Sequence, residues 1–195
     1  GQLTAMTGSL NLASNLLTGI IPTQVGYLTA LTGGILVGEN QFTSLPTEVG
    51  RLTLLSQNFE VQSNLLYGDL PTELGSLTSL ERDVRFDSNY FGQNSSALRP
   101  SGIPSQIGRL QRLTARFSFA SNQLLSTIPT QLGMLGTIFS NAPDITYFDI
   151  SYNSLCGSFP TELLSLVDFV TNDFGWTATG SSENSNLINI SCIEP

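Results

Sequence analysis

The chain contains no histidine and no lysine, and charged residues make up only 11% of its 195 positions. Histidine is the commonest general base and metal ligand near neutral pH, so its absence disfavours most enzyme classes and most zinc sites. The seven positive residues are all arginine and stand against fifteen acids, which gives a net charge of −8. Because nucleic-acid binding requires basic residues to neutralise phosphates, we expect no nucleic-acid partner.

Cysteine is also scarce, with Cys156 and Cys192 as the two examples in the chain. Such a pair stays reduced in the cytosol, whereas on the secretory route it would oxidise to a disulfide. Glycosylation sequons at Asn94 and Asn189 favour the secretory route, so we expect a secreted or cell-surface glycoprotein. The sequence has no apolar run long enough for a membrane span. The sequence begins at Gly1 with no targeting segment, so we expect a fragment of a longer chain.

One phrase recurs six times along the sequence. Its core is Pro-Thr-Glu-Leu-Gly or a close variant, and the copies begin at Pro22, Pro46, Pro71, Pro104, Pro129 and Pro160. A pair of leucines, two alternating apolar residues and an asparagine complete the unit. The asparagines are Asn15, Asn40, Asn64, Asn89, Asn122 and Asn153. Six copies at one underlying period predict a repeat architecture in which stacked units share a core.

The residues of each repeat unit predict its local structure. The apolar alternation predicts a short strand with one buried face. The asparagine after it lies where the chain turns, and its amide can bond backbone groups of neighbouring coils. The proline then starts a short helical or irregular return leg with inward leucines. Leu-x-x-Leu returns between the strands, in place of hairpin turns, argue against an antiparallel sandwich.

The combined motif, Leu-x-x-Leu-x-x-x-Leu-x-Leu-x-x-Asn-x-Leu-x-Gly-x-Ile-Pro, resembles the plant-type leucine-rich repeat. The Pro-Thr-Glu-Leu-Gly phrasing is also similar to leucine-rich repeat proteins of diatoms and algae. The resemblance implies an α/β repeat solenoid, a right-handed coil with a concave parallel β-sheet and short 3-10 or irregular convex legs. It further implies an extracellular recognition module, as in receptor ectodomains, inhibitor proteins and a few ice-binding proteins.

The repeats divide the chain into two regions. Residues 1–165 form the solenoid of about six coils, with insertions at 92–101 and 136–142 that we expect to be extruded as loops. Residues 166–195 lose the repeat and carry clustered aromatic residues, so we expect a C-terminal cap over the open end of the core. A bridge between Cys156 and Cys192 would fasten this cap to the last coil.

No group of residues predicts catalysis or cofactor binding. Serine is abundant, but histidine and lysine, the usual bases beside a nucleophile, are absent. The acids are spread along the coils, and Glu81 and Asp83 flank Arg82 as local charge compensation. Arg109, Arg112 and Arg116 form a basic cluster that we assign to a solvated return leg. We therefore expect a protein that is not an enzyme and has no cofactor or metal.

The strand positions that face away from the core form the candidate binding strip. They include Asn11, Leu36, Glu60, Arg85, Asp87, Ser118 and Asp149. The middle of the strip is acidic, with Glu60 and Asp87, and Asp149 adds a further acid, while Arg85 is the cation we assign to it. We therefore expect a protein, peptide or glycan partner, cationic or rich in hydrogen-bond donors.

Two other functions stay open. The solenoid could be a structural or assembly component of a larger complex. Alternatively, it could bind ice through the small polar residues that follow the repeat prolines, Thr23, Thr47, Thr72, Ser105, Thr130 and Thr161. The same row is explained by the preference of serine and threonine for helix starts.

Overall fold

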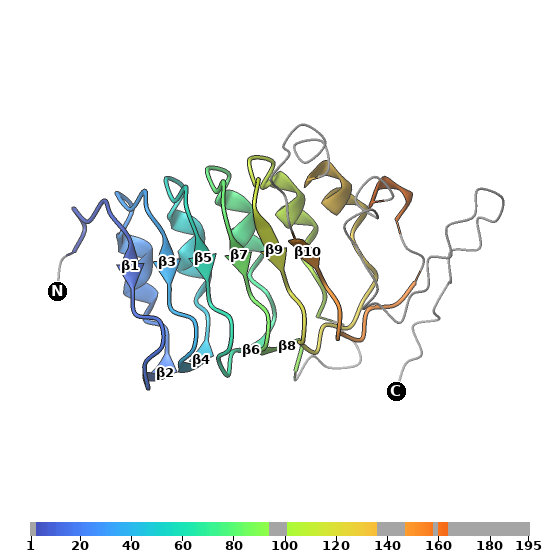
Figure 1. The fold of residues 1–195 in the computed structure, drawn as a ribbon, viewed down its shortest axis with the longest axis horizontal. Helices are drawn as coiled ribbons and strands as arrows, with labels where there is room; N and C mark the ends of the chain where they lie inside the picture. The colour runs from blue at the N-terminus through green and yellow to red at the C-terminus, as the bar shows by residue number, and fades with distance from the viewer. Residues whose placement is uncertain (1–2, 94–100, 136–146, 158–159, 164–195) are drawn as a thin grey trace.

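The computed structural model describes residues 3–93, 101–135, 147–157 and 160–163. Six short strands form one parallel sheet, and their order in the sheet follows their order in the chain (Figure 1). The strands are β1 (Leu10–Asn11), β3 (Ile35–Leu36), β5 (Phe59–Glu60), β7 (Val84–Arg85), β9 (Arg116–Ser118) and β10 (Tyr147–Asp149). Each coil therefore adds one strand beside that of the coil before it, as the repeat predicts.

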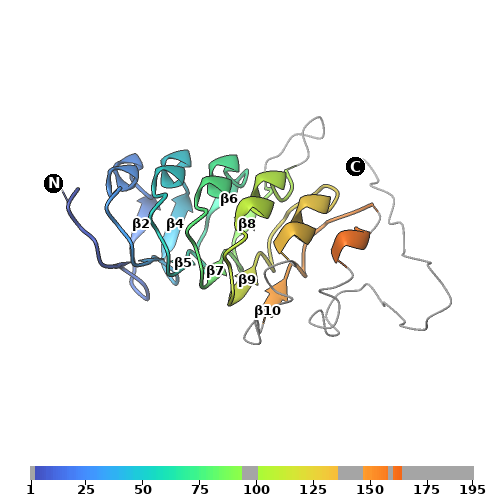
Figure 2. The same ribbon diagram turned by 90° about the horizontal axis from the view of Figure 1, so that it is seen from above.

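The return legs carry short 3-10 helices. These are η1 (Thr23–Tyr27), η2 (Thr47–Arg51), η3 (Thr72–Ser76), η4 (Ser105–Arg109) and η5 (Thr130–Leu132). Figures 1 and 2 show them in a second row, across the core from the six-stranded sheet. Each begins directly after a repeat proline, whose ring fixes φ near the helical value, as at Pro71 with φ −61°. The parallel sheet and these helices confirm the repeat solenoid.

A second set of strands lies beside the first sheet and was not predicted. β2 (Thr18–Ile20) pairs in parallel with β4 (Gln41–Ser44), and β6 (Tyr67–Gly68) pairs with β8 (Tyr90–Phe91). These strands lie between the repeat asparagine and the repeat proline of each coil. Gly19 and Gly68 have φ of +84° and +86°, a left-handed conformation that glycine adopts without penalty. Each of the first four coils thus contributes one strand to the six-stranded sheet and one to a two-stranded sheet.

The core runs along the whole array between the sheet and the helices. The inward strand residues, such as Phe59 and Val61, are 1% and 0% exposed, and the paired leucines of each return leg are buried as well. Phenylalanine rings link successive coils: Phe86 lies 5.2 Å from Phe59 and 5.0 Å from Phe119 between ring centroids. This continuous apolar column explains why no single coil could close its own core.

The repeat glycine of the return leg permits close stacking of the helices. A Cβ added at Gly50 in η2 would lie 2.5 Å from the Cβ and 2.6 Å from the carbonyl oxygen of Glu73 in η3. Gly26 has the same relation to Glu48 one coil earlier, at 2.5 Å from its carbonyl oxygen. The glycine in the repeat phrase is therefore required by the distance between coils.

Several predicted features lie outside the described residues. They are most of the insertion at 92–101, the whole insertion at 136–142, the cap at 166–195, the sequons at Asn94 and Asn189, and Cys192. Cys156 is described and is 4% exposed, and its pairing with Cys192 stays a prediction. The division into a solenoid and a cap likewise stays a prediction.

Candidate functional site: the outer face of the sheet

The repeat asparagines lie just after the sheet strands and connect neighbouring coils. Asn64 is 4% exposed, and its Nδ2 donates to the carbonyls of Val61 in its own coil and Val37 in the preceding one. Its Oδ1 accepts a hydrogen bond from the Phe42 N–H of the preceding coil at 2.9 Å. The same intercoil pattern recurs at Asn40, Asn89, Asn122 and Asn153.

Asn15 differs from the other repeat asparagines because it belongs to the first coil. It is exposed, and its Nδ2 donates to the carbonyls of Leu12 and Ala13 in its own coil. The residue before every repeat asparagine has a positive φ between 52° and 57°, at Ser14, Glu39, Ser63, Ser88, Ser121 and Tyr152. In the later coils, this left-handed step precedes an asparagine whose amide bonds the coil before it.

Every coil presents three residues on the outer face of the six-stranded sheet, which we call the sheet face. They alternate with the two inward apolar residues, so in the third coil they are Asn58, Glu60 and Gln62. Parallel pairing aligns equivalent positions, with Glu60 opposite Arg85 and Arg85 opposite Ser118. The next strand continues the row, with Ser118 opposite Asp149.

The candidate strip residues all lie on described strands or just after them, but their exposure differs. Asn11 is exposed, whereas Leu36, Glu60, Arg85, Asp87 and Asp149 are half-buried. Ser118 is only 2% exposed, since longer side chains of adjacent coils flank it. The sheet face is therefore uneven, with short residues at the floor and charged residues around them.

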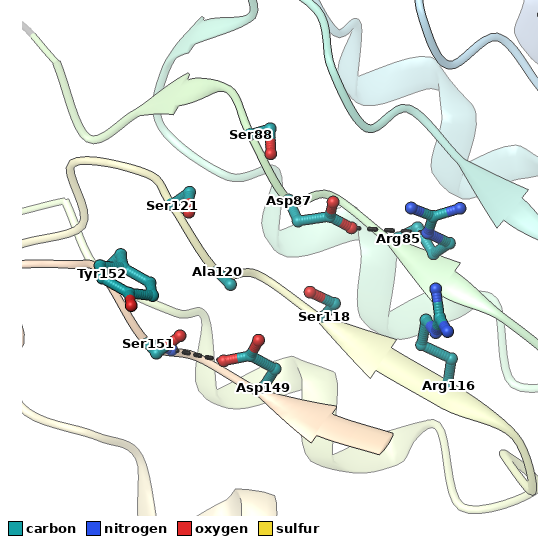
Figure 3. Close-up of a pocket in the computed structure, with 10 residues that line it drawn as sticks. All are labelled: Arg85, Asp87, Ser88, Arg116, Ser118, Ala120, Ser121, Asp149, Ser151 and Tyr152. Carbon is teal, nitrogen blue, oxygen red and sulfur yellow. Dashed lines mark hydrogen bonds and ion pairs between the residues drawn. The ribbon is translucent and has the colours of Figure 1, made fainter. Parts of the chain in front are cut away.

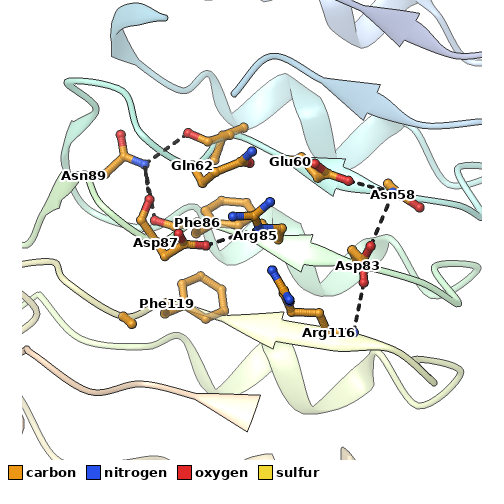
Figure 4. Close-up of polar contacts among 12 residues, drawn as sticks. Asn58, Glu60, Gln62, Asp83, Arg85, Phe86, Asp87, Asn89, Arg116 and Phe119 are labelled. Atoms are coloured by element: carbon orange, nitrogen blue, oxygen red, sulfur yellow. Dashed lines mark hydrogen bonds and ion pairs between the residues drawn. The ribbon is translucent and has the colours of Figure 1, made fainter. Parts of the chain in front are cut away.

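The interpretation of Arg116 as a return-leg residue is wrong. It is the first residue of β9, and it lies on the sheet face beside Arg85 (Figure 4). The position just before the first inward residue of each strand was not assigned to the sheet face from the sequence. In three neighbouring coils this position is Asn58, Asp83 and Arg116. The signal was available, since the alternation of each strand extends one step further toward the N-terminus.

A polar network occupies this missed row. Asn58 donates from Nδ2 to Oε1 of Glu60 at 2.6 Å and to Oδ2 of Asp83 at 3.5 Å. The other oxygen of Asp83 accepts the backbone N–H of Arg116 at 3.1 Å. Figure 4 shows these contacts crossing three neighbouring strands. The network fixes two carboxylates, that of Glu60 on β5 and that of Asp83 just before β7.

The charges of the fourth coil are also placed differently from the prediction. Glu81 forms an ion pair with Arg112 of the next coil, so it does not simply compensate Arg82. Arg85 and Asp87 approach each other on the sheet face, with Nε 3.5 Å from Oδ1. The sheet face therefore carries two arginines, Arg85 and Arg116, among its acids.

A pocket of about 290 Å³ lies on the sheet face over β7, β9 and β10 (Figure 3). Arg85 of β7 and Arg116 of β9 line one end of the pocket. Tyr152, which follows β10 in the chain, lines the opposite end. Asp149 lies between them, with its Oδ1 accepting the Ser151 N–H at 2.9 Å. Serine hydroxyls supply much of the remaining lining.

Two kinds of feature are absent from the described part of the chain. Residues 3–93, 101–135, 147–157 and 160–163 contain no group of three acidic, cysteine or histidine side chains that could hold a metal ion. None of the helices in these same ranges has the length and apolar character to cross a membrane.

Comparison with known proteins places this geometry in context. Residues 144–166 match the family model for the Leucine Rich Repeat. No curated protein matches the chain in sequence. A solved ectodomain of the Arabidopsis thaliana membrane receptor kinase GASSHO1/SCHENGEN3, in complex with CASPARIAN STRIP INTEGRITY FACTOR 2, is 27% identical with a TM-score of 0.68. The match covers 86% of this chain and 18% of that one.

Two further structures are similar. A TDR receptor is 28% identical with a TM-score of 0.65, over 80% of this chain and 26% of that one. A BIR3–SERK2 complex from Arabidopsis thaliana is 28% identical with a TM-score of 0.58, over 76% and 69%. This chain thus spans about a quarter or less of the first two receptors. Motif and fold agree: the chain has a leucine-rich repeat solenoid fold and is similar to plant receptor ectodomains.

Proposed function

We propose that this chain is a non-catalytic recognition module that binds a peptide or protein partner along its sheet face. The observation that supports this most is the row of mainly polar side chains held in register across the six strands of the sheet. Two of the similar structures are described as complexes, one with an integrity factor and one between BIR3 and SERK2. The proposal transfers that general mode of use to this chain.

The charges of the sheet face give the proposed partner its chemistry. Glu60 and Asp83 share the Asn58 amide, and Asp149 lies in the same row across the sheet as Glu60. Asp87 lies two residues beyond Arg85 of that row. Four carboxylates against Arg85 and Arg116 leave the face negative, in a chain whose net charge is −8. A partner with cationic groups or many donors complements this face and would associate faster at low salt.

The same proposal includes the setting of the module. We propose an extracellular protein, secreted or at the cell surface, with glycans at Asn94 and Asn189 and a disulfide between Cys156 and Cys192. The support is the pair of sequons, the cysteine pair and the similarity to receptor ectodomains. Intact-mass measurement of the chain made in a secretory host, before and after glycan removal and reduction, tests these modifications directly.

A matched pair of charge variants tests the recognition face. The first changes three sheet-face acids to their amides, Glu60→Gln, Asp87→Asn and Asp149→Asn. The second changes three acids of the 3-10 helix row, Glu48→Gln, Glu73→Gln and Glu162→Gln, so both raise the net charge by the same amount. The probes are peptides selected on the wild-type chain from a random displayed library.

Affinity and its salt dependence are then measured for each selected peptide with each variant. We expect the sheet-face variant to lose about tenfold or more in affinity and to show a flatter salt dependence, because charged contacts are removed. The helix-row variant should bind as the wild type does. Equal behaviour of the two variants would contradict the proposed face.

A further inference from the structure

The pocket over β7, β9 and β10 differs from the rest of the sheet face in its density of polar groups. Four serines line it, Ser88, Ser118, Ser121 and Ser151, together with two arginines and two aspartates. The remaining lining residues are Ala120 and Tyr152, so an apolar side chain would find little apolar surface here. The lining therefore selects a polar ligand.

Some of these polar groups are buried with unused hydrogen-bonding capacity. Ser151 is 4% exposed, and its Oγ has no hydrogen-bond partner among the described residues. Nε of Arg85 and Oδ1 of Asp87 are buried as well, and 3.5 Å separates them without a hydrogen bond of good geometry. A buried polar atom without a partner is unfavourable, so a ligand that supplies the missing bonds gains affinity.

The charges of the lining argue against a simple ion as that ligand. Arg85 and Arg116 would attract an anion, but Asp87 and Asp149 lie in the same small space and would repel it. A cation would be attracted by the two aspartates and repelled by the two arginines. Hydroxyl groups satisfy both kinds of lining residue, because each one donates to a carboxylate or serine and also accepts from a guanidinium.

The size and rim of the pocket agree with a hydroxyl-rich ring. Its volume of about 290 Å³ is at the lower end of small-molecule sites, which suits one ring with its substituents. Tyr152 is 70% exposed at the rim, where its ring offers a flat apolar surface for the C–H face of such a ligand.

We propose that this pocket binds a single sugar residue of a glycan. The inference adds a glycan to the peptide or protein partner proposed above, and it rests on the sheet face being the binding surface. The sugar hydroxyls would bond Asp87, Asp149 and Ser151 in the middle of the pocket and the arginines at one end. The ring would lie against Tyr152.

Saturation-transfer NMR on the full chain tests this inference. The probes are cellotetraose, laminaritetraose, mannotetraose, xylotetraose and tetragalacturonic acid, with glycylglycine as a zwitterion that carries charges but no hydroxyls. We expect transfer to at least one tetrasaccharide and none to glycylglycine. For the tetrasaccharide that binds, Ser151→Ala should weaken binding by about tenfold, which is the loss of one hydrogen bond to a buried group.

Two further variants keep the result interpretable. Tyr152→Ser should also weaken sugar binding, and it should fold because serine occupies the same positive-φ position at Ser63, Ser88 and Ser121. Ser154→Ala changes an exposed serine of the same coil outside the pocket and should bind as the wild type does.

Three outcomes would overturn the inference: no transfer to any tetrasaccharide, transfer to glycylglycine as well as to a tetrasaccharide, or sugar binding that Ser151→Ala and Tyr152→Ser leave unchanged. These outcomes differ from a failure of the proposed function. If selected peptides still bind and still depend on the sheet-face acids, the recognition function stands and the sugar assignment alone falls.

Discussion

The Asn64 side-chain oxygen accepts the backbone N–H of Phe42, 22 residues earlier, at 2.9 Å. The same side chain also donates to the carbonyl of Val37 at 3.1 Å, so one amide group satisfies two backbone groups of the preceding coil. Backbone groups at these turns have no partner in a regular strand ladder. The repeat asparagine therefore serves as the polar link between coils, as the phenylalanine column serves as the apolar link.

The first prediction concerns this asparagine row. Replacing Asn64 or Asn89 by alanine should lower the free energy of unfolding by about 1–3 kcal/mol each, because buried backbone groups lose their partners. Asn15→Ala should have a smaller effect, since Asn15 is exposed and bonds its own coil. Urea unfolding monitored by circular dichroism measures all three. Equal midpoints for the three variants would contradict the role of the row.

The second prediction concerns the stacking of the helices. Gly50→Ala would place a methyl group 2.5 Å from the Glu73 Cβ, so the coils must move apart. We expect a loss of about 1–3 kcal/mol in unfolding free energy, typical of overpacking. Gly8→Ala is the control, because no atom lies within 4 Å of the added Cβ there. Thermal melts compare the stability of the two variants. If Gly50→Ala were as stable as Gly8→Ala, the proposed role of the repeat glycine would be wrong.

The third prediction concerns the cysteines. A bridge between Cys156 and Cys192 closes a loop of about 36 residues and should contribute roughly 3–4 kcal/mol by reducing the entropy of the unfolded chain. Reduction should therefore lower the melting temperature of the protein. Peptide mapping without reducing agent identifies the linked fragments, and two free thiols in the folded protein would refute the pairing.

The fourth prediction concerns ice binding. The polar row at Thr23, Thr47, Thr72, Ser105, Thr130 and Thr161 occupies the first residue of successive 3-10 helices or turns, where small polar residues are common. At Thr47 and Thr72 the hydroxyl donates to the adjacent glutamate, so acids lie in the row as well. We expect no thermal hysteresis and no ice shaping at high protein concentration. Faceted ice crystals would favour the ice-binding alternative.

The fold was predictable from the sequence because one local pattern was repeated six times. A strand of two or three residues, as in β5, gives little signal alone, but its recurrence with the asparagine and proline fixes the coil. The two small sheets were not predicted, since β2 and β6 contain a glycine and no clear alternation of apolar and polar residues. Their pairing depends on contact between coils, which local pattern does not contain.

The sheet face was predictable only in part. Alternation placed Glu60, Arg85 and Asp149 on the outer face, where the structure has them. It did not place Arg116, because the boundary of so short a strand is uncertain by a residue or two. Nor did it reveal that Glu81 pairs with Arg112, since the two residues are 31 positions apart and meet only when coils stack.

The most direct test of the sheet-face account is a backbone chemical-shift map of the ¹⁵N-labelled chain with its tightest selected peptide. The account predicts perturbed amides in and around β3, β5, β7, β9 and β10, with the largest shifts near Glu60, Arg85 and Asp149. Amides of η1 to η5 should keep their positions. Perturbations confined to the 3-10 helices, or to β2, β4, β6 and β8, would contradict the claim that this chain recognises its partner along the sheet face.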